Sequence, residues 1–285
     1  MIDYFAKFES VGAGCSTAGL FTAGTLMDLG LAGRSAIVCG SSRGLGRACA
    51  EALAREGVDV LVTGRTAGDV ETAVAALARL GAGRVAGLAC DVTSRAGREA
   101  ILAARPNPDI LVNNSAGPPP KAFLDTEAQE WAPGVERAMI APLLLTQAVL
   151  PGMIARKFGR IVNITSAMVT TPRPHMSLSA GARAGLTAAM KAISLDVARH
   201  NVTINNLLPE RIDTDRQVFL AKATAERDNI SYEEARERQV ASIAARRLGR
   251  PEEFGAACAF LCGVLAGFIS GQNLHLDGGS YPALI

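Results

Sequence analysis

The sequence is poor in aromatic residues, which make up only 5% of its 285 residues and include a single tryptophan, Trp131. Its charges also nearly cancel, because 29 lysines and arginines face 27 aspartates and glutamates for a net charge of +2. Nucleic-acid partners are held by a strong positive field or by aromatic side chains on which bases stack, and membrane surfaces by a similar field. We therefore expect neither a nucleic acid nor a membrane as a partner.

Signals for metal binding, secretion and membrane insertion are scarce as well. The three histidines are far apart and the six cysteines form no Cys-x-x-Cys pair, so we expect no metal site. The cysteines indicate small buried residues in a reducing compartment. We find no stretch that approaches 18 uncharged apolar residues and no basic N-terminal region. We therefore expect no transmembrane span, no secretory signal and a cytoplasmic location.

Apolar residues, at 49%, and charged residues, at 20%, are typical of a globular protein with a sizeable core. The N-terminal part differs from the rest, since segment 10–25 is rich in glycine, serine, threonine and alanine and has weak periodicity. We interpret residues 1–28 as a loosely packed extension. Residues 29–285 contain no linker or repeat and are predicted to form one domain.

Short apolar runs alternate with segments of helical periodicity along this domain. Strands that alternate with helices form parallel sheets. We therefore predict the α/β class, with one doubly wound, Rossmann-type domain built on a parallel sheet of about seven strands. The predicted strands are 35–39, 58–63, 85–90, 110–112, 160–164, 203–207 and 273–276, and the main predicted helices are 47–56, 70–80, 126–154, 182–199, 215–245 and 252–262.

A glycine-rich loop lies between the first predicted strand and the first helix. Its glycines, Gly40, Gly44 and Gly46, have the spacing G-x-x-x-G-x-G. Glycine permits a tight turn and a close approach of the backbone to a diphosphate, and the helix N-terminus adds free N–H groups for the anion. The alternative is a plain turn. The strand–loop–helix context favours a phosphate site formed by Gly40, Ser42, Arg43, Gly44, Leu45 and Gly46.

The end of the second strand indicates which dinucleotide would bind. A carboxylate at this point favours NAD(H), because it accepts a hydrogen bond from the 2′-hydroxyl and repels a 2′-phosphate. The chain has Arg65 there instead, and Arg43 lies in the loop. Two arginines can clamp a 2′-phosphate, so we expect NADP(H) in preference to NAD(H). Otherwise both are ordinary solvated arginines.

With further motifs in the same order, the chain resembles the short-chain dehydrogenase/reductase family, especially its branch of 3-oxoacyl-acyl-carrier-protein reductases. The resemblance extends from about residue 29 to 280 and implies the fold, a nicotinamide dinucleotide and a small-molecule or acyl-thioester substrate. It also implies that Asp91 and Val92 bracket the adenine, and that Asn113, Ile212 and Thr214 lie near the nicotinamide. The motifs are the glycine loop, Asp91-Val92, Asn113–Gly117, Ile161–Ser166, Pro209 with Ile212–Thr214, and Leu276–Gly279.

The resemblance also implies catalytic residues, and three of four positions depart from the family pattern. In the family, a serine polarises the substrate carbonyl, a tyrosine transfers the proton, a lysine lowers the pKa of the tyrosine, and an asparagine supports a water relay. Ser166 fits the serine position. Ser179 stands at the tyrosine position, Arg183 at the lysine position and Ala138 at the asparagine position.

A serine hydroxyl is a far weaker acid than a phenol, whose reference pKa is about 10. Ser166, Ser179 and Arg183 are thus our candidate catalytic residues, with the proton delivered by water that Ser179 and Arg183 hold. His175 is another candidate donor, if the chain is already helical one turn before Ser179. The alternative is an exposed loop histidine.

Three functions remain open from the sequence. The first is an NADP(H)-dependent oxidoreductase that acts on a carbonyl or an alcohol. The second is a dinucleotide-binding protein with little or no dehydrogenase activity, such as a sensor or an assembly partner. The third is an enzyme of different chemistry on the same scaffold. Small residues on the helices at 126–154 and 182–199, together with the resemblance, predict a homotetramer or homodimer.

Overall fold

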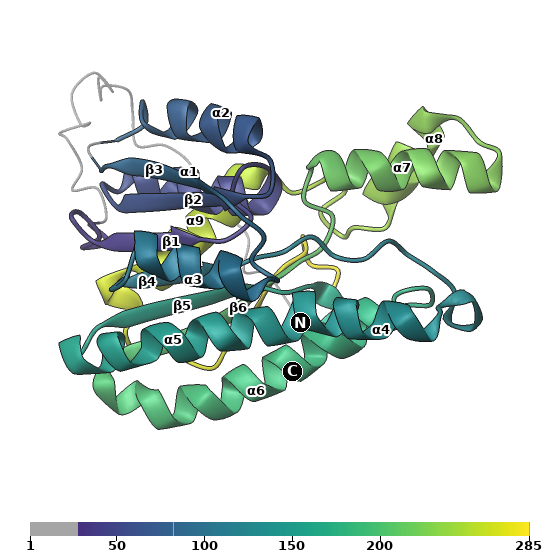
Figure 1. Ribbon diagram of the computed structural model, residues 1–285. Helices are drawn as coiled ribbons and strands as arrows, with labels where there is room; N and C mark the ends of the chain where they lie inside the picture. The colour runs from purple at the N-terminus through teal and green to yellow at the C-terminus, as the bar shows by residue number, and fades with distance from the viewer. Residues whose placement is uncertain (1–27, 82, 285) are drawn as a thin grey trace, which may run out of the picture.

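Seven parallel strands form the centre of the fold (Figure 1). The computed structural model describes residues 28–81 and 83–284, so the predicted extension, except residue 28, lies outside the described residues. The strand order β3-β2-β1-β4-β5-β6-β7 reverses direction between β1 and β4, which confirms the predicted doubly wound sheet. The strands are β1 (Ser35–Val38), β2 (Asp59–Gly64), β3 (Val85–Ala89), β4 (Ile110–Asn113), β5 (Gly159–Ile164), β6 (Val202–Pro209) and β7 (Asn273–Leu276).

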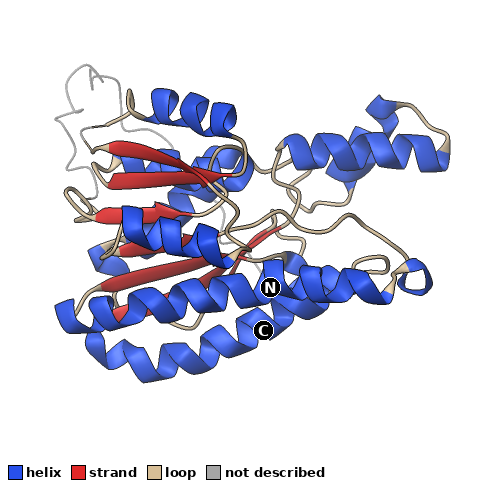
Figure 2. Cartoon of the chain, in the orientation of Figure 1, coloured by secondary structure: helices blue, strands red, loops and turns tan. Residues whose placement is uncertain are grey.

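The central strands are continuous apolar runs because helices cover both faces of the sheet. Every residue of β4 and of β5 is buried. Two hydrophobic clusters result, one on each face of the sheet. Figure 2 shows the helices on both sides of the strands. On one face lie α1 (Gly44–Arg55), α2 (Ala67–Leu77) and α9 (Pro251–Cys262), and on the other lie α3 (Arg95–Ala104), α5 (Ala141–Arg156) and α6 (Ser177–Val197).

The segment predicted as one helix at 126–154 has three parts. A first helix, α4 (Ala128–Val135), continues through the π-helical turn Glu136–Ile140 into α5. Ala138, at the position of the family's asparagine, is buried within this π turn. A π turn inside a helix is common at functional sites because it turns side chains out of the regular register. The chain thus has a wider turn here without the amide side chain.

The expectation that no segment could cross a membrane overlooked this helix. By length and composition, Ala128–Arg156 is long and apolar enough, with a mean hydropathy of 1.8 over its best window. In the structure α5 packs on β5, α3 and α6, as the core helix of a globular domain does. Only 39% of that window is buried in the single chain, so an apolar face of the helix is left uncovered.

The charged segment predicted at 215–245 forms two helices, α7 (Asp215–Asp228) and α8 (Tyr232–Ala241). They lie beyond the carboxyl ends of the strands, on the same side as α4 (Figure 1). Ser231 caps α8, because its side chain accepts a hydrogen bond from the backbone N–H of Glu234. The two helices therefore lie next to the carboxyl ends of the strands, where the predicted site residues are found.

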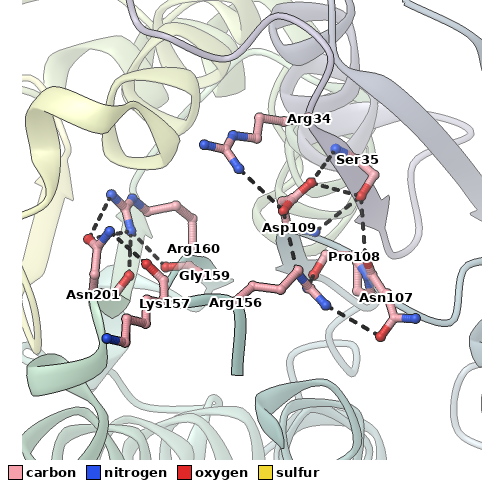
Figure 3. A network of polar contacts seen from close by, with 10 residues as sticks. All are labelled: Arg34, Ser35, Asn107, Pro108, Asp109, Arg156, Lys157, Gly159, Arg160 and Asn201. Carbon is pink, nitrogen blue, oxygen red and sulfur yellow. Dashed lines mark hydrogen bonds and ion pairs between the residues drawn. The ribbon is translucent and has the colours of Figure 1, made fainter. Parts of the chain in front are cut away.

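At the opposite end of the strands, a polar network fixes the amino ends of β1, β4 and β5 (Figure 3). The carboxylate of Asp109 accepts hydrogen bonds from the backbone N–H and the hydroxyl of Ser35, which join β4 to β1. Arg160 at the start of β5 is 1% exposed and donates to the backbone carbonyls of Gly159 and Asn201. Burial lowers the pKa of Arg160. These contacts hold the amino ends of the strands, far from the predicted site.

The cysteines that the structure describes are buried or half-buried and free, as expected. Cys15 lies outside the described residues. No group of His, Cys, Asp or Glu in residues 28–81 and 83–284 has the arrangement of a metal site. Burial raises the pKa of the Cys39 thiol to about 12, so this side chain remains a neutral packing group.

Candidate active site

The glycine loop has the backbone that its sequence requires. Gly40 and Gly44 adopt positive φ angles of 54° and 60°, which side chains rarely tolerate. At Gly46, an added Cβ would lie 2.4 Å from the carbonyl oxygen of Gly40, so no other residue fits without a shift. The loop leads directly into the N-terminus of α1. It therefore forms a tight cradle of backbone N–H groups at a helix N-terminus.

Two neighbouring strands hold this loop in place. The amide of Asn114, one residue after β4, donates to the Gly40 carbonyl at 3.0 Å. The hydroxyl of Ser41 accepts from the backbone N–H of Thr63 on β2, also at 3.0 Å. Asn114 belongs to the motif Asn113–Gly117, but the motif does not predict this contact. The adjacent Asn113 belongs to the same motif. The two asparagines differ in the direction of their side chains, which the sequence does not indicate.

The two arginines proposed to bind a 2′-phosphate flank the cradle. Arg43 is exposed at the start of α1, and its side chain makes no hydrogen bond or ion pair within the described residues. Arg65 is exposed directly after β2. Ser42 lies against Gly64, where an added Cβ would approach its hydroxyl oxygen to 2.7 Å. The loop and the end of β2 are thus in contact, and both arginines remain available to a ligand.

Asp91 lies just beyond β3 and is ionised. Hydrogen bonds from the backbone N–H and hydroxyl of Thr93, with the charges of Arg65 and Arg137, hold its pKa below the ordinary value. Val92 beside it is half-buried. The carboxylate therefore lies within range of the Arg65 charge, and its place at the adenine end of a dinucleotide stays a prediction.

The side chain of Asn113 serves the sheet. It is 2% exposed and donates to the Asn163 side chain at 2.9 Å and to the Thr146 hydroxyl at 3.2 Å. Asn163 donates in turn to Asn206 at 2.9 Å, and Asn206 donates to Asn273 at 2.8 Å. These four residues are aligned across β4, β5, β6 and β7, and we call them the asparagine ladder. A direct contact of the Asn113 amide with a cofactor stays a prediction.

Ser166, Ser179 and Arg183 come from two elements. Ser166 follows β5, is half-buried, and accepts a hydrogen bond from the backbone N–H of Met168 at 3.2 Å. Ser179 and Arg183 lie in the first turns of α6, with 5% and 8% exposure. In the described part of the chain, no side-chain hydrogen bond joins Ser179 to Ser166 or to Arg183. A link between the three would need water or a ligand.

Arg183 is a buried cation without a carboxylate partner in residues 28–81 and 83–284. Its Nη1 donates to the backbone carbonyl of Ile164 at 2.8 Å, two residues before Ser166. Burial, and then the charge of Arg216, lower its pKa to about 10. The side chain therefore remains protonated at neutral pH.

His175 does not belong to α6, which begins at Ser177, so the helical turn that would aim it at Ser179 is missing. It is exposed, with a positive φ of 63°, and its carbonyl accepts a hydrogen bond from the backbone of Lys121. The condition for His175 as a proton donor, a helix that already includes it, is therefore not met, and the alternative of an exposed loop histidine holds.

The segment after β6 carries the other predicted contacts. Ile212 is 6% exposed, and Thr214 precedes α7 with its hydroxyl free of any capping bond. Glu210 replaces the family's glycine and is 8% exposed. Its carboxylate pairs with Arg173 at 3.1 Å and with Arg211 at 3.3 Å. This acidic side chain is therefore neutralised within the chain.

A cavity of about 300 Å³ lies beside this segment. Glu210, Ile212, His275 and Asp277 are among its lining residues, whereas Ser166, Ser179 and Arg183 are not. The His275 ring stacks on Tyr281 with centroids 4.2 Å apart, and its Nε2 lies 3.3 Å from the Thr170 hydroxyl. The cavity borders the predicted site at Ile212 and is distinct from its serines.

The comparisons with known proteins agree over nearly the whole domain. The sequence profile of the enoyl-(acyl carrier protein) reductase family matches residues 40–281. The 3-oxoacyl-[acyl-carrier-protein] reductase of Vibrio cholerae is 33% identical over 257 residues, which cover 89% of this chain and 99% of that protein.

Two solved structures have the same architecture. An NADPH-dependent reductase involved in bacilysin biosynthesis superimposes with a TM-score of 0.83 at 28% identity, and the match covers 88% of this chain and 99% of the other. The L-sorbose reductase of Gluconobacter frateurii, complexed with NADPH and L-sorbose, gives a TM-score of 0.85 at 26% identity, with 90% and 100% covered.

Proposed function

The chain belongs to the short-chain dehydrogenase/reductase family and is an oxidoreductase, and we propose that it uses NADP(H) to interconvert a carbonyl and an alcohol. The similar 3-oxoacyl-[acyl-carrier-protein] reductases favour an acyl-thioester substrate or a small molecule of like chemistry. The single observation that carries the proposal is the glycine cradle between two free arginines.

The described residues fit such a cofactor. The close approach of Gly46 to Gly40 leaves the backbone bare where a diphosphate needs N–H donors. Arg43 and Arg65 supply charge for a 2′-phosphate, and the chain has no carboxylate directly after β2 to repel it. Asp91, ionised by its hydrogen bonds from Thr93, would lie at the adenine end with Val92. Ile212 and Thr214 would lie at the nicotinamide end.

A bound nicotinamide dinucleotide supplies or accepts the hydride. The chain's own groups hold the substrate and the proton. The Ser166 hydroxyl, fixed after β5 by the Met168 N–H, would donate to the carbonyl oxygen. Ser179 and Arg183 would hold a water that delivers the proton to the same oxygen, with the Arg183 charge stabilising the oxyanion.

A second function is favoured by one observation: position 179 has no phenol, and no side-chain hydrogen bond joins Ser179 to Arg183 in the described residues. Without an efficient acid, the chain would bind the dinucleotide and turn over little, as a sensor or assembly partner does. The retained cradle would serve this function equally well.

Titration of the purified full chain with NADPH and NADH, followed by a panel of carbonyl substrates that includes a 3-oxoacyl thioester, separates the two. Tighter binding of NADPH with oxidation of NADPH by any carbonyl in the panel supports the oxidoreductase. Binding with no oxidation supports the second function. Equal binding of the two cofactors contradicts the assignment of Arg43 and Arg65.

For the whole molecule, we propose a homotetramer or homodimer located in the cytoplasm. The assembly is supported by the uncovered apolar face of α4 and α5 and by Leu195 on α6, which is 70% exposed. The location is supported by the free, reduced cysteines of the core.

A further inference from the structure

Buried Arg183 has a second, half-buried arginine beside it, Arg216 on α7. Arg183 extends from α6 and Arg216 from α7 to the same loop, at Gly117-Pro118 after β4. One Arg216 nitrogen donates to the Pro118 carbonyl at 2.9 Å. The Arg183 Nη2 lies 3.6 Å from the place where a Cβ on Gly117 would be. Both guanidinium groups thus meet at Gly117-Pro118, close to the end of the strand that leads to Ser166.

The charges of this pair are not neutralised by any described side chain. Neither arginine takes part in an ion pair, whereas the nearby Arg173 and Arg211 share the carboxylate of Glu210. Burial and then the charge of Arg216 lower the pKa of Arg183, and burial lowers the pKa of Arg216. Two repelling cations with restricted access to water are costly unless an anion joins them.

We propose that Arg183 and Arg216 form a site for the carboxylate of an anionic oxo-acid substrate. The inference rests on the proposed function, because it names the substrate class of the same active site. A carboxylate held by two guanidinium forks would lie on the Ser166 side of Arg183, since Nη1 of Arg183 is anchored to Ile164. The oxo group of the same substrate would then lie beside the Ser166 hydroxyl. The carboxylate itself would take no part in the chemical change.

The cofactor diphosphate is a poorer occupant of this site. Its cradle is the loop from Gly40 to Gly46, which already provides glycine backbone and a helix N-terminus. Arg216 is anchored instead to the loop that follows β4 and Asn114, at Pro118. The departure from the family at position 183 also fits, because an arginine presents a flat fork to a carboxylate where a lysine presents a single point.

The direct test is isothermal titration of the full chain, saturated with NADP⁺, with butanoate and with its neutral isostere butanamide. We expect butanoate to bind at least about tenfold more tightly, because hydrogen bonds between ionised partners are roughly twice as strong as neutral ones. The Arg216→Met variant should reduce this ratio to about one, and Arg216→Lys should restore part of it. Arg238→Met removes an equal charge from α8, where Arg238 pairs with Glu234 and Asp228, and should leave the ratio unchanged.

Three outcomes would overturn the proposal. The first is equal binding of butanoate and butanamide by the wild type, and the second is an unchanged ratio in Arg216→Met. The third is a loss of NADPH affinity in Arg216→Met as large as its loss of butanoate affinity, which would assign the pair to the cofactor. A kinetic arm uses 3-oxobutanoate and its methyl ester, and Arg216→Met should raise KM for the acid alone. If the wild type oxidises NADPH with none of the carbonyl substrates but binds butanoate more tightly than butanamide, the proposed oxidoreductase fails and the anion site stands.

Discussion

At the residue scale, the choice of cofactor depends on the charge at the end of β2. Arg65 is exposed there, and the Asp91 carboxylate, which interacts with its charge, already accepts hydrogen bonds from Thr93. An arginine presents a planar set of N–H donors that matches the oxygens of a phosphate. Substitution of this one side chain should therefore change the preference between the two cofactors while leaving the glycine cradle intact.

We expect Arg65→Asp to lower the affinity for NADPH at least about tenfold, a loss of 1.4 kcal/mol or more, because attraction to the 2′-phosphate becomes repulsion. Affinity for NADH should stay equal or rise, since the new carboxylate can accept the 2′-hydroxyl. Fluorescence titration with both cofactors measures this. Arg79→Asp makes the same charge change on an exposed side chain after α2 and should alter neither affinity. An unaltered NADPH affinity in Arg65→Asp would count against the clamp.

Catalysis at this scale depends on the acid that position 179 lacks. General acid catalysis typically contributes about 10²–10⁴-fold in rate. We expect Ser179→Tyr combined with Arg183→Lys to raise kcat towards this range with a neutral 3-oxoacyl thioester, because the lysine charge lowers the pKa of the new phenol. Each single substitution should give much less.

Steady-state assays of NADPH oxidation over pH measure the gain. Adding Ser166→Ala to the double variant is the control, since it should remove the gain if the carbonyl is held by that hydroxyl. A wild-type rate near 10 s⁻¹, the median of enzymes, would show that the chain already has an efficient proton donor. The account of the missing acid would then be wrong.

At the element scale, the asparagine ladder ties four strands together. Each inner amide both donates and accepts, so removal of Asn163 leaves one buried N–H of Asn113 and the buried side-chain oxygen of Asn206 without a partner. The side chains line up because the parallel registers pair Asn113 with Asn163, Asn163 with Asn206, and Asn206 with Asn273. The ladder fixes β4 and β5, whose ends carry Asn114 and Ser166.

We expect Asn163→Leu to lower the free energy of unfolding by about 2–6 kcal/mol, because an orphaned buried polar group costs about 1–3 kcal/mol and two are created. Urea denaturation measures this loss. Asn273→Leu is the matched control: Asn273 is exposed on the edge strand, so water can replace it, and the loss should stay below about 1 kcal/mol. Equal losses in the two variants would contradict the ladder's role.

The elements were predictable because their signals are local. Apolar runs gave all seven strands, and the glycine spacing gave the cradle, with positive φ at Gly40 and Gly44. The direction of a side chain is not local, and so the sequence did not predict that the Asn113 amide lies in the ladder. Arg216 carried no signal in the sequence, since an arginine on a charged helix reads as solvated. Only the fold brings it to Arg183.

At the scale of the whole molecule, the outer helices have exposed apolar surface. Leu144 on α5 and Leu195 on α6 are 40% and 70% exposed, and the long helix through α4 and α5 is buried over only 39% of its apolar window. The small residues expected to allow close approach of helices have mixed roles. Ala188 is exposed, but an added Cβ on Gly185 would lie 3.0 Å from the Met139 sulfur of the same chain. Part of the small-residue signal therefore serves packing within the chain.

We expect the protein to be a homotetramer or homodimer at micromolar concentration, since apolar surface of this kind is buried when identical helix faces pair about a twofold axis. Light scattering coupled to size exclusion measures the mass. Leu144→Arg combined with Leu195→Arg should shift it to a smaller species, because a charge buried at an interface without a partner costs several kcal/mol. Arg substitution of Leu265, which is 65% exposed after α9, is the comparison on the other face of the sheet. A monomeric wild type would contradict the assembly, and a mass unaffected by Leu144→Arg and Leu195→Arg would move the interface away from α5 and α6.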